Sequence, residues 1–124
     1  MSEHNDLGKY GEQLAEAYLS KEGYQIKARN WKFRRGELDI VAQKGDWIVI
    51  VEVKTRRLNA VERPQDAVTI GKQRRIVRAA DTYIQKHEID LECRFDIISV
   101  IINGGKYELD HMQGAFQPLV QTKA

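Results

Sequence analysis

Two carboxylates and one ammonium group lie close together in the segment GELDIVAQKGDWIVIVEVKTRR. Asp39 stands in the first of two apolar runs, and Glu52 and Lys54 stand in the second. Carboxylate oxygens suit Mg²⁺, which is commonly held by one or two carboxylates together with substrate phosphate. An ammonium beside such an ion can stabilise negative charge that builds up on a phosphate in the transition state. These residue types therefore predict chemistry at a phosphate, provided that the fold brings them together.

The two apolar runs are predicted to form a β-hairpin. Apolar and polar residues alternate along both runs, which is typical of strands. Between the runs, Gly45 can adopt the positive φ angle that a two-residue primed turn requires. A two-residue loop predicts these facing pairs: Lys44 with Trp47, Ala42 with Val49, Ile40 with Val51, Asp39 with Glu52, Leu38 with Val53 and Glu37 with Lys54.

In this register one face of the hairpin is apolar, and Leu38 shares that face with Ile40. The other face carries Asp39 directly opposite Glu52. Cβ atoms of facing residues are about 4.5–5.5 Å apart, so the two carboxylates repel each other. Lys54 lies on the same face, roughly 6–7 Å further along the strand. The sequence therefore predicts a divalent cation between the carboxylates, with an ammonium beside it.

A single charged residue at a strand end is usually ordinary solvated surface. Here three such residues interrupt apolar strands and converge in one register, which favours a functional site. Two secondary candidates are Glu37, which faces Lys54 in this register, and Gln73, which lies on the apolar side of a later helix. A buried amide needs polar partners, which a site would supply. A plain position at the helix end explains Gln73 equally well.

The hairpin carries a motif that resembles a known signature. GELDIV followed by VEVKTR resembles the PD-(D/E)XK motif of the restriction-endonuclease-like fold, with Leu38 where the motif has proline. The longer order E, GY, RNW, GELDIVA, VEVKTR, KQRR and RFDII, over roughly residues 8–116, resembles the YraN family, small proteins regarded as nucleases similar to archaeal Holliday-junction resolvases. The resemblance implies that Asp39, Glu52 and Lys54 are catalytic, and it adds Glu12 from the first helix. Without it, Glu12 reads as a solvated glutamate or a partner of Lys9.

The resemblance implies a Mg²⁺- or Mn²⁺-dependent endonuclease that hydrolyses DNA phosphodiester bonds, on branched or structured DNA, as a homodimer. In that reading Asp39 and Glu52 bind the metal with help from Glu12, and Lys54 orients water and stabilises negative charge in the transition state. A second hypothesis is a non-catalytic nucleic-acid-binding or adaptor module that keeps the fold. Metal-dependent cleavage of DNA would support the first hypothesis, and binding without cleavage would support the second.

Basic residues gather on both sides of the carboxylate strands, although the net charge is only +2. A polyanion backbone passing the carboxylates would meet these clusters. Basic residues beside hydrophobic strands can also serve simply to prevent aggregation. The residues predicted to contact nucleic acid are Arg34, Arg35, Arg56, Arg57, Lys72 and Arg75.

The expected elements follow the order helix, three strands, helix, two strands. Helical spacing of apolar residues predicts helices over residues 5–22 and 69–87, and alternation predicts a first strand over 24–30 that continues to Phe33. Asn103-Gly104-Gly105 predicts the turn of a second hairpin, over 94–102 and 106–112, in which Arg94 and Asp96 are expected to pair. Residues 58–66 are expected to form a loop. This order describes an α/β domain with a mixed sheet flanked by helices, in agreement with the restriction-endonuclease-like core.

Composition predicts one globular domain over residues 1–124, with frayed ends at 1–5 and 117–124. The longest apolar runs are too short to span a bilayer, and no secretory pattern begins the chain, so a cytoplasmic protein without membrane contact is expected. Cys93 is the single cysteine, which excludes an internal disulfide framework. The three histidines lack the spacing of a zinc site.

Overall fold

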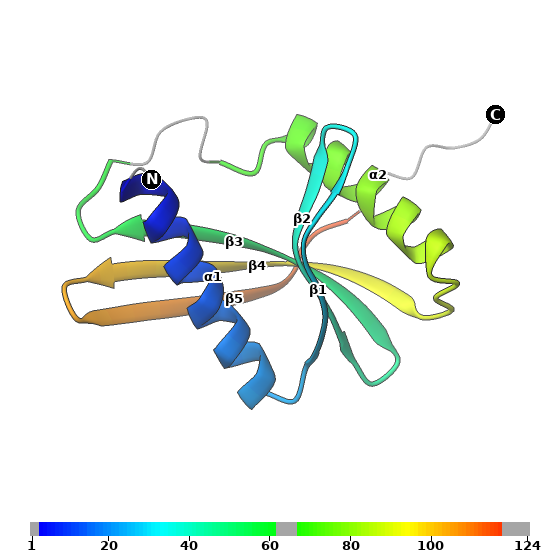
Figure 1. Ribbon diagram of the computed structural model, residues 1–124, viewed down its shortest axis with the longest axis horizontal. Helices are drawn as coiled ribbons and strands as arrows, with labels where there is room; N and C mark the ends of the chain where they lie inside the picture. Colours follow the sequence, from blue (N-terminus) through cyan, green and yellow to red (C-terminus); the bar gives the residue numbers. More distant parts are fainter. Residues whose placement is uncertain (1–2, 62–66, 118–124) are drawn as a thin grey trace.

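The computed structural model describes residues 3–61 and 67–117, with side chains from Asp6 onward. Its elements are α1 (Glu3–Lys21), β1 (Gln25–Phe33), β2 (Gly36–Lys44), β3 (Trp47–Arg57), α2 (Ile70–Lys86), β4 (Glu92–Asn103) and β5 (Lys106–Phe116) (Figure 1). The predicted element order is confirmed. Residues 3–5, predicted to be frayed, belong to the first turn of α1. The rest of the predicted frayed ends, except Gln117, and part of the predicted loop, 62–66, lie outside the described residues.

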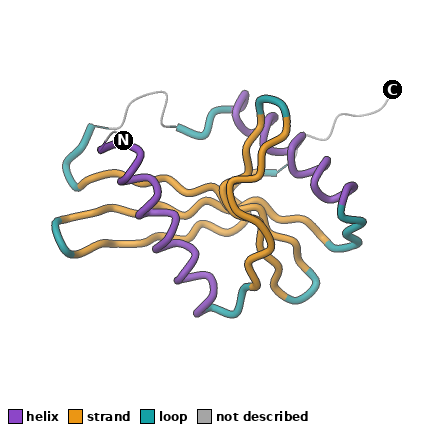
Figure 2. Tube along the Cα trace, in the orientation of Figure 1, coloured by secondary structure: helices purple, strands orange, loops and turns teal. Residues whose placement is uncertain are grey.

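The five strands form one mixed sheet in the order β1-β2-β3-β4-β5. β3 and β4 are parallel, and the other neighbours are antiparallel. A parallel pair needs a crossover, which α2 provides between β3 and β4. The two helices pack on opposite faces: Ala15 and Leu19 of α1 join one core cluster, and Ile76 and Tyr83 of α2 join the other (Figure 2). The mixed sheet with flanking helices was therefore predicted correctly.

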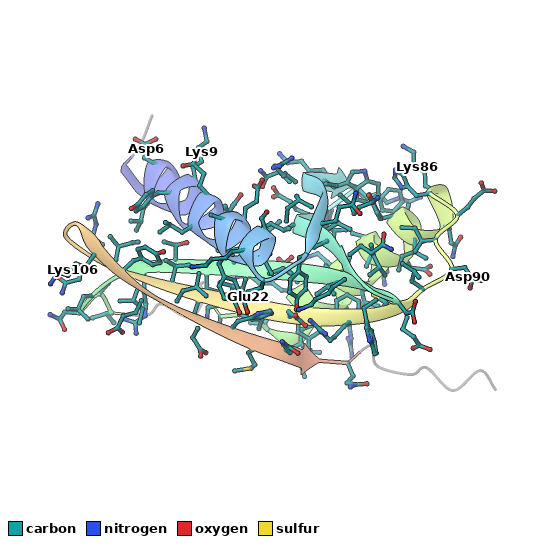
Figure 3. All side chains as sticks on the ribbon, turned by 90° about the horizontal axis from the view of Figure 1, so that it is seen from below. Asp6, Lys9, Glu22, Lys86, Asp90 and Lys106 are labelled. Atoms are coloured by element: carbon teal, nitrogen blue, oxygen red, sulfur yellow. The ribbon has the colours of Figure 1, made fainter. Side chains whose placement is uncertain are left out.

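Helix α2 closely matches its prediction. Thr69 is its N-cap, with a side chain that accepts a hydrogen bond from the Lys72 N–H, and His87 is its C-cap. Helix α1 packs against the sheet through the fully buried Ala15 and Leu19, with Leu7, Leu14 and Tyr18 packed beside them, whereas Tyr10 is 43% exposed. The charged residues near the start of α1, such as Asp6 and Lys9, point away from the sheet (Figure 3).

The β2–β3 hairpin has the predicted register from its turn as far as the pair Ile40 and Val51, and Gly45 has a φ angle of 57°. Beyond that pair the strands diverge, so the expected pairs of Leu38 with Val53 and of Glu37 with Lys54 were wrong. Leu38 was also predicted to share a face with Ile40, but the two residues lie in different core clusters, on opposite faces. The alternation of β2 is therefore broken at Asp39.

The outer half of β2 leaves β3 because it stays paired with β1 and packs against α2. The β1–β2 pairing continues to Phe33 and Gly36. A Cβ atom on Gly36 would lie 2.8 Å from the carbonyl oxygen of Arg75, so glycine permits this close approach of α2. The strands are no longer paired beyond Ile40 and Val51, and we call this divergence of β2 and β3, which begins at Asp39, the opening.

Helix α1 approaches β3 closely, on the face of the sheet opposite to α2. A Cβ atom on Gly11 would lie 1.8 Å from Thr55 Oγ1 and 2.7 Å from Thr55 Cβ. Rotation of the threonine side chain cannot move its Cβ atom, so a larger residue must push the helix and the strand apart. Gly11 thereby sets the distance at which the next residue, Glu12, reaches the sheet.

A buried hydrogen-bond network ties α1 to the far edge of the sheet. Asp96 of β4 is fully buried and accepts two hydrogen bonds from Arg94, at 2.8 and 2.9 Å, and one from the Gly114 N–H at 3.0 Å. His111 Nε2 lies 2.7 Å from the same carboxylate, and His111 Nδ1 lies 2.9 Å from the Tyr18 hydroxyl of α1. The predicted pair of Arg94 and Asp96 is confirmed, and the structure adds its other partners. These donors hold the pKa of Asp96 below its ordinary value although burial opposes them.

Among the described residues, no helix is long and apolar enough to cross a membrane.

Replacing Gly11 by alanine is expected to destabilise the protein by about 1–3 kcal/mol, because the new methyl group collides with Thr55. Alanine is otherwise the better helix former by about 1 kcal/mol. Gly8 of the same helix supplies the control, since a Cβ atom there meets nothing within 4 Å. Urea unfolding of Gly8→Ala should show unchanged or higher stability. Equal stabilities of the two variants would contradict the close approach of α1 and β3.

Replacing Asp96 by asparagine is expected to cost about 3 kcal/mol at neutral pH, because one partner of a buried ion pair is removed. The folded-state pKa of Asp96 is lowered, so its stabilisation is present above the unfolded pKa of about 3.9 and is lost as the pH falls through the folded value. Urea unfolding between pH 3 and pH 7 should show the difference between the two proteins shrinking at the acidic end. A difference that does not change with pH would mean that the charge of Asp96 contributes nothing.

Candidate functional site

Asp39 and Glu52 are joined across the opening between β2 and β3 by side-chain-to-backbone hydrogen bonds. The Val53 N–H donates to the Asp39 carboxylate at 2.9 Å. The Asp39 N–H lies 3.4 Å from Glu52 Oε2, a long hydrogen bond to that carboxylate. These two contacts take the place of the ladder bonds that end at Ile40 and Val51. The structure thus brings the two acids together, as the sequence predicted, but through a break in the hairpin rather than through its regular pairing.

The environment of this pair opposes its charge. Burial is the main cause that raises the pKa of Asp39, and the charges of Glu12 and Glu37 raise it further. Burial is also the main cause for Glu52, followed by the charge of Asp39. The single backbone hydrogen bond to each carboxylate favours its charged form but is outweighed. Two partly buried carboxylates that repel each other attract a cation.

The charges of two further carboxylates act on the pair. Glu12 reaches it from α1, and burial is the main cause of its raised pKa, opposed by a hydrogen bond with the Asn30 side chain. Glu37 is exposed on β2, yet its charge raises the pKa values of Glu12, Asp39 and Glu52. The predicted Glu12 and Glu37 therefore lie near enough to Asp39 and Glu52 for their charges to raise the pKa values of the pair, and Glu12 comes from a different element.

Lys54 and Gln73 are the two remaining residues that the sequence predicted for the site. Lys54 is partly buried, lies two residues beyond Glu52 on β3 and is level with Ser99 of β4. The Gln73 side-chain amide donates to the carbonyl of Val68 at 3.2 Å. The Gln73 amide thus has its partner just before its own helix, which is what the helix-end alternative expected.

The fit of a divalent metal depends on how many protein ligands it needs. Within residues 3–61 and 67–117, no group of three or more histidine, cysteine, aspartate or glutamate side chains is arranged to hold a metal ion. Mg²⁺ does not require such a cage, because it keeps several waters and commonly takes one or two carboxylates plus substrate phosphate. Asp39 and Glu52, both partly buried and each accepting one backbone hydrogen bond, fit that requirement.

The predicted basic residues belong to elements on either side of the opening, whose arrangement can be followed in Figure 1. One group lies on the β1–β2 turn and at the start of α2, which the contact at Gly36 holds together. The other lies at the end of β3. The first group contains Arg34, Arg35, Lys72 and Arg75, and the second contains Arg56 and Arg57. All but the partly buried Lys72 are exposed, so both groups can meet a polyanion.

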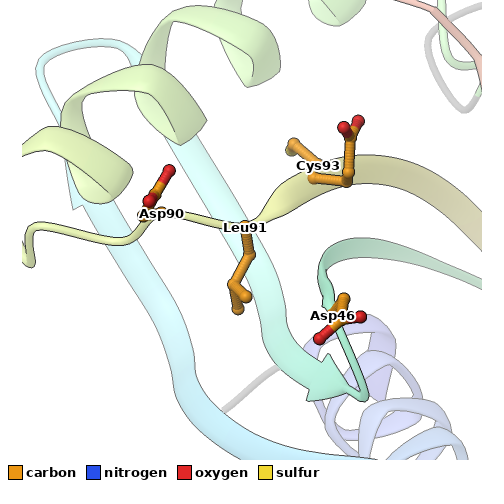
Figure 4. A pocket seen from close by; sticks show the side chains of 5 residues that line it. Asp46, Asp90, Leu91 and Cys93 are labelled. Carbon is orange, nitrogen blue, oxygen red and sulfur yellow. The ribbon is translucent and has the colours of Figure 1, made fainter.

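Asn30 was not predicted to belong to the site. It hydrogen-bonds Glu12 and lies level with Asp39 on the neighbouring strand, between the pairs Arg29 with Ile40 and Trp31 with Leu38. A sequence signal existed, because asparagine is depleted in strands and tolerates positive φ angles. A separate hollow, lined by Asp46 and Asp90 among others, lies near the start of β3 and β4, away from Glu52 (Figure 4).

Comparison with known proteins places the chain in a family. The model of "Uncharacterised protein family UPF0102" matches residues 11–100. The chain belongs to this family. UPF0102 proteins of Bacteroides fragilis and Bacteroides thetaiotaomicron are 52% and 51% identical to it, each over 118 residues that cover 95% of the chain and 98% of the relative. A UPF0102 protein of Flavobacterium psychrophilum is 46% identical over 94% of the chain and 98% of its own length. The UPF0102 match spans all four acids of the site as well as Lys54.

Replacing Glu52 by glutamine is expected to stabilise the metal-free protein by about 1 kcal/mol at pH 8, because it removes an ionisable group whose charged form is opposed by burial and by the charge of Asp39. The folded-state pKa values of the pair are raised, to about 7 for Asp39 and about 9 for Glu52, so wild-type stability should fall as the pH rises from about 4 to about 9. Glutamine keeps an oxygen that can accept the Asp39 N–H. Thermal unfolding in EDTA at pH 4 and pH 8 measures the effect.

The exposed Glu108 of β5 provides the matched control, and Glu108→Gln should leave stability almost unchanged at both pH values. A Glu52→Gln variant that is no more stable than the wild type at pH 8 would show that the carboxylate pair does not destabilise the folded protein.

Proposed function

We propose that this UPF0102 protein is a divalent-metal-dependent endonuclease that hydrolyses phosphodiester bonds in DNA. The observation that carries the proposal is the carboxylate pair at the break of the β2–β3 hairpin, in which Asp39 and Glu52 share one partly buried opening. Burial first, and then neighbouring carboxylates, raise the pKa values of both groups, so the fold keeps the two acids together at a cost in free energy. Such arrangements occur preferentially at functional sites.

The residues divide the work by their chemistry. Asp39 and Glu52 would hold Mg²⁺ or Mn²⁺, and Glu12 would complete the set directly or through water. The bound ion would neutralise charge on the scissile phosphate. Lys54 can donate hydrogen bonds to a phosphate oxygen or to the attacking water. In the reaction the water oxygen bonds to phosphorus, the bond from phosphorus to one sugar oxygen breaks, and the released sugar oxygen takes up a proton.

The fold supports a relationship to restriction-endonuclease-like enzymes. A mixed sheet with a helix on each face carries an aspartate at the break of one strand, and the neighbouring strand carries the glutamate and the lysine. This arrangement agrees with the PD-(D/E)XK signature, and the resemblance to the YraN family adds the glutamate of α1. We accordingly assign the protein to this class as part of the proposal.

The charge distribution supports a nucleic-acid substrate. A phosphate backbone that crosses the opening would meet Arg34 and Arg35 on one side and Arg56 and Arg57 on the other. Cations on both sides would offset the repulsion between phosphates and the carboxylates. Following the resemblance, branched or structured DNA is the proposed substrate.

The test incubates the purified protein with linear, flapped and four-way DNA, with and without Mg²⁺ or Mn²⁺. Cleavage should require the metal and should fall on the order of 10²-fold or more in Asp39→Ala, because that variant loses one of the two carboxylates proposed to hold the ion. Glu108→Gln provides the control on a distant exposed acid and should cleave like the wild type. Gel electrophoresis of end-labelled DNA measures the products.

Metal-dependent binding without cleavage of any of these substrates would reject the enzyme and favour the alternative, a nucleic-acid-binding or adaptor module. Sedimentation of the same preparation tests the homodimer that the resemblance implies.

A further inference from the structure

Asn30 has an unusual backbone conformation for a strand residue. Its φ angle is 48°, in the left-handed region that residues other than glycine rarely adopt. It lies inside β1, with Arg29 and Trp31 paired to β2 on either side. A left-handed residue within a strand interrupts the alternation of side chains and bends the strand. Such conformations persist where the surrounding structure enforces them, and they are concentrated at functional sites.

The position of Asn30 coincides with the break in β2. Asn30 and Asp39 lie level with each other between two described pairs, Arg29 with Ile40 and Trp31 with Leu38. On either side of Asp39, Leu38 and Ile40 point into opposite core clusters, although regular alternation would place them on one face. The irregular residue of β1 thus lies beside the irregular residue of β2, where the Asp39 carboxylate turns toward β3 and accepts the Val53 N–H.

The side chain of Asn30 interacts with Glu12, the acid of the site that comes from helix α1. It hydrogen-bonds Glu12, and this contact favours the charged form of that carboxylate against burial and the charge of Glu37. The neighbouring Arg29 forms an ion pair with Glu16, one helical turn after Glu12. The adjacent residues Arg29 and Asn30 of β1 therefore interact with two acids of α1: Arg29 with Glu16, and Asn30 with Glu12.

We propose that Asn30 is a positioning residue of the metal site, with two separable functions. Its left-handed backbone turns Asp39 into the opening, and its side-chain amide orients Glu12 toward the same point. This inference rests on the proposed metal-dependent function. It adds no metal ligand: the proposed ligands remain Asp39 and Glu52, assisted by Glu12.

Two substitutions separate the functions. Asn30→Gly keeps access to the positive φ angle and removes the amide, whereas Asn30→Ala removes the amide and also opposes the backbone conformation. Asn59→Gly is the matched control, because Asn59 also has a positive φ angle, of 68°, and is exposed in the turn after β3. Titration calorimetry of the full chain with Mn²⁺, without nucleic acid, measures affinity, and thermal unfolding in EDTA measures stability.

We expect Asn30→Gly to unfold close to the wild-type temperature but to bind Mn²⁺ at least about tenfold more weakly, the loss typical when a residue that orients a metal ligand is removed. Asn30→Ala should lose the same affinity and also unfold at a lower temperature. Asn59→Gly should retain wild-type affinity. A purely structural role for Asn30 would not separate affinity from stability in this way.

Wild-type affinity in Asn30→Gly, beside measurable Mn²⁺ binding by the unmodified protein, would overturn the role of the amide and leave the proposed function intact. Equal unfolding temperatures of the glycine and alanine variants would overturn the backbone role. Absence of Mn²⁺ binding by the wild type would overturn this inference, whereas the metal-dependent function, in which substrate phosphate can supply part of the coordination, is decided by the cleavage assay.

Discussion

The site depends on one constraint, which is that β2 pairs with β3 over only half of its length. If the ladder continued beyond Ile40 and Val51, Asp39 and Glu52 would be facing neighbours in a regular antiparallel pair. Instead the strands separate, and each carboxylate accepts a hydrogen bond from a backbone N–H of the opposite strand. Buried backbone donors are rarely left without a partner, so the divergence is stable only if acceptors replace the lost carbonyls. The two acids thus stabilise the opening that they occupy.

Two glycines determine how closely the helices approach this opening. Gly36 lets α2 approach the outer half of β2, which helps to keep that half away from β3. Gly11 lets α1 approach β3, which brings Glu12 within reach of the carboxylate pair. Neither position has a positive φ angle, so the requirement at both is the absence of a side chain. Packing of the helices and assembly of the site are therefore parts of the same arrangement.

Much of this could be predicted from the sequence, because periodicity and turn chemistry are local. Gly45 predicted the tight turn and hence the register near it, and Thr69 and His87 bounded the second helix. The break at Asp39 could not be predicted, because it arises from competition of β1 and α2 with β3 for the same strand. The role of Asn30 and the proximity of His111 to Asp96 likewise depend on contacts between residues distant in the chain. The order of elements, the sheet and the meeting of Asp39 with Glu52 were predicted correctly, whereas the break in β2 and the contacts of Asn30 and His111 were not.

The sheet contains two acidic centres, and their opposite chemistry argues which one is functional. Asp96 has its own cation, Arg94, as well as the Gly114 N–H and His111, and its pKa is lowered. That carboxylate needs nothing further, and its network serves to join β4 and β5 to α1 through Tyr18. Asp39 and Glu52 each accept one described backbone hydrogen bond, they repel each other, and their pKa values are raised. A protein gains nothing in stability from such a pair by itself. Its persistence is explained if a cation that binds there relieves the repulsion and serves the function.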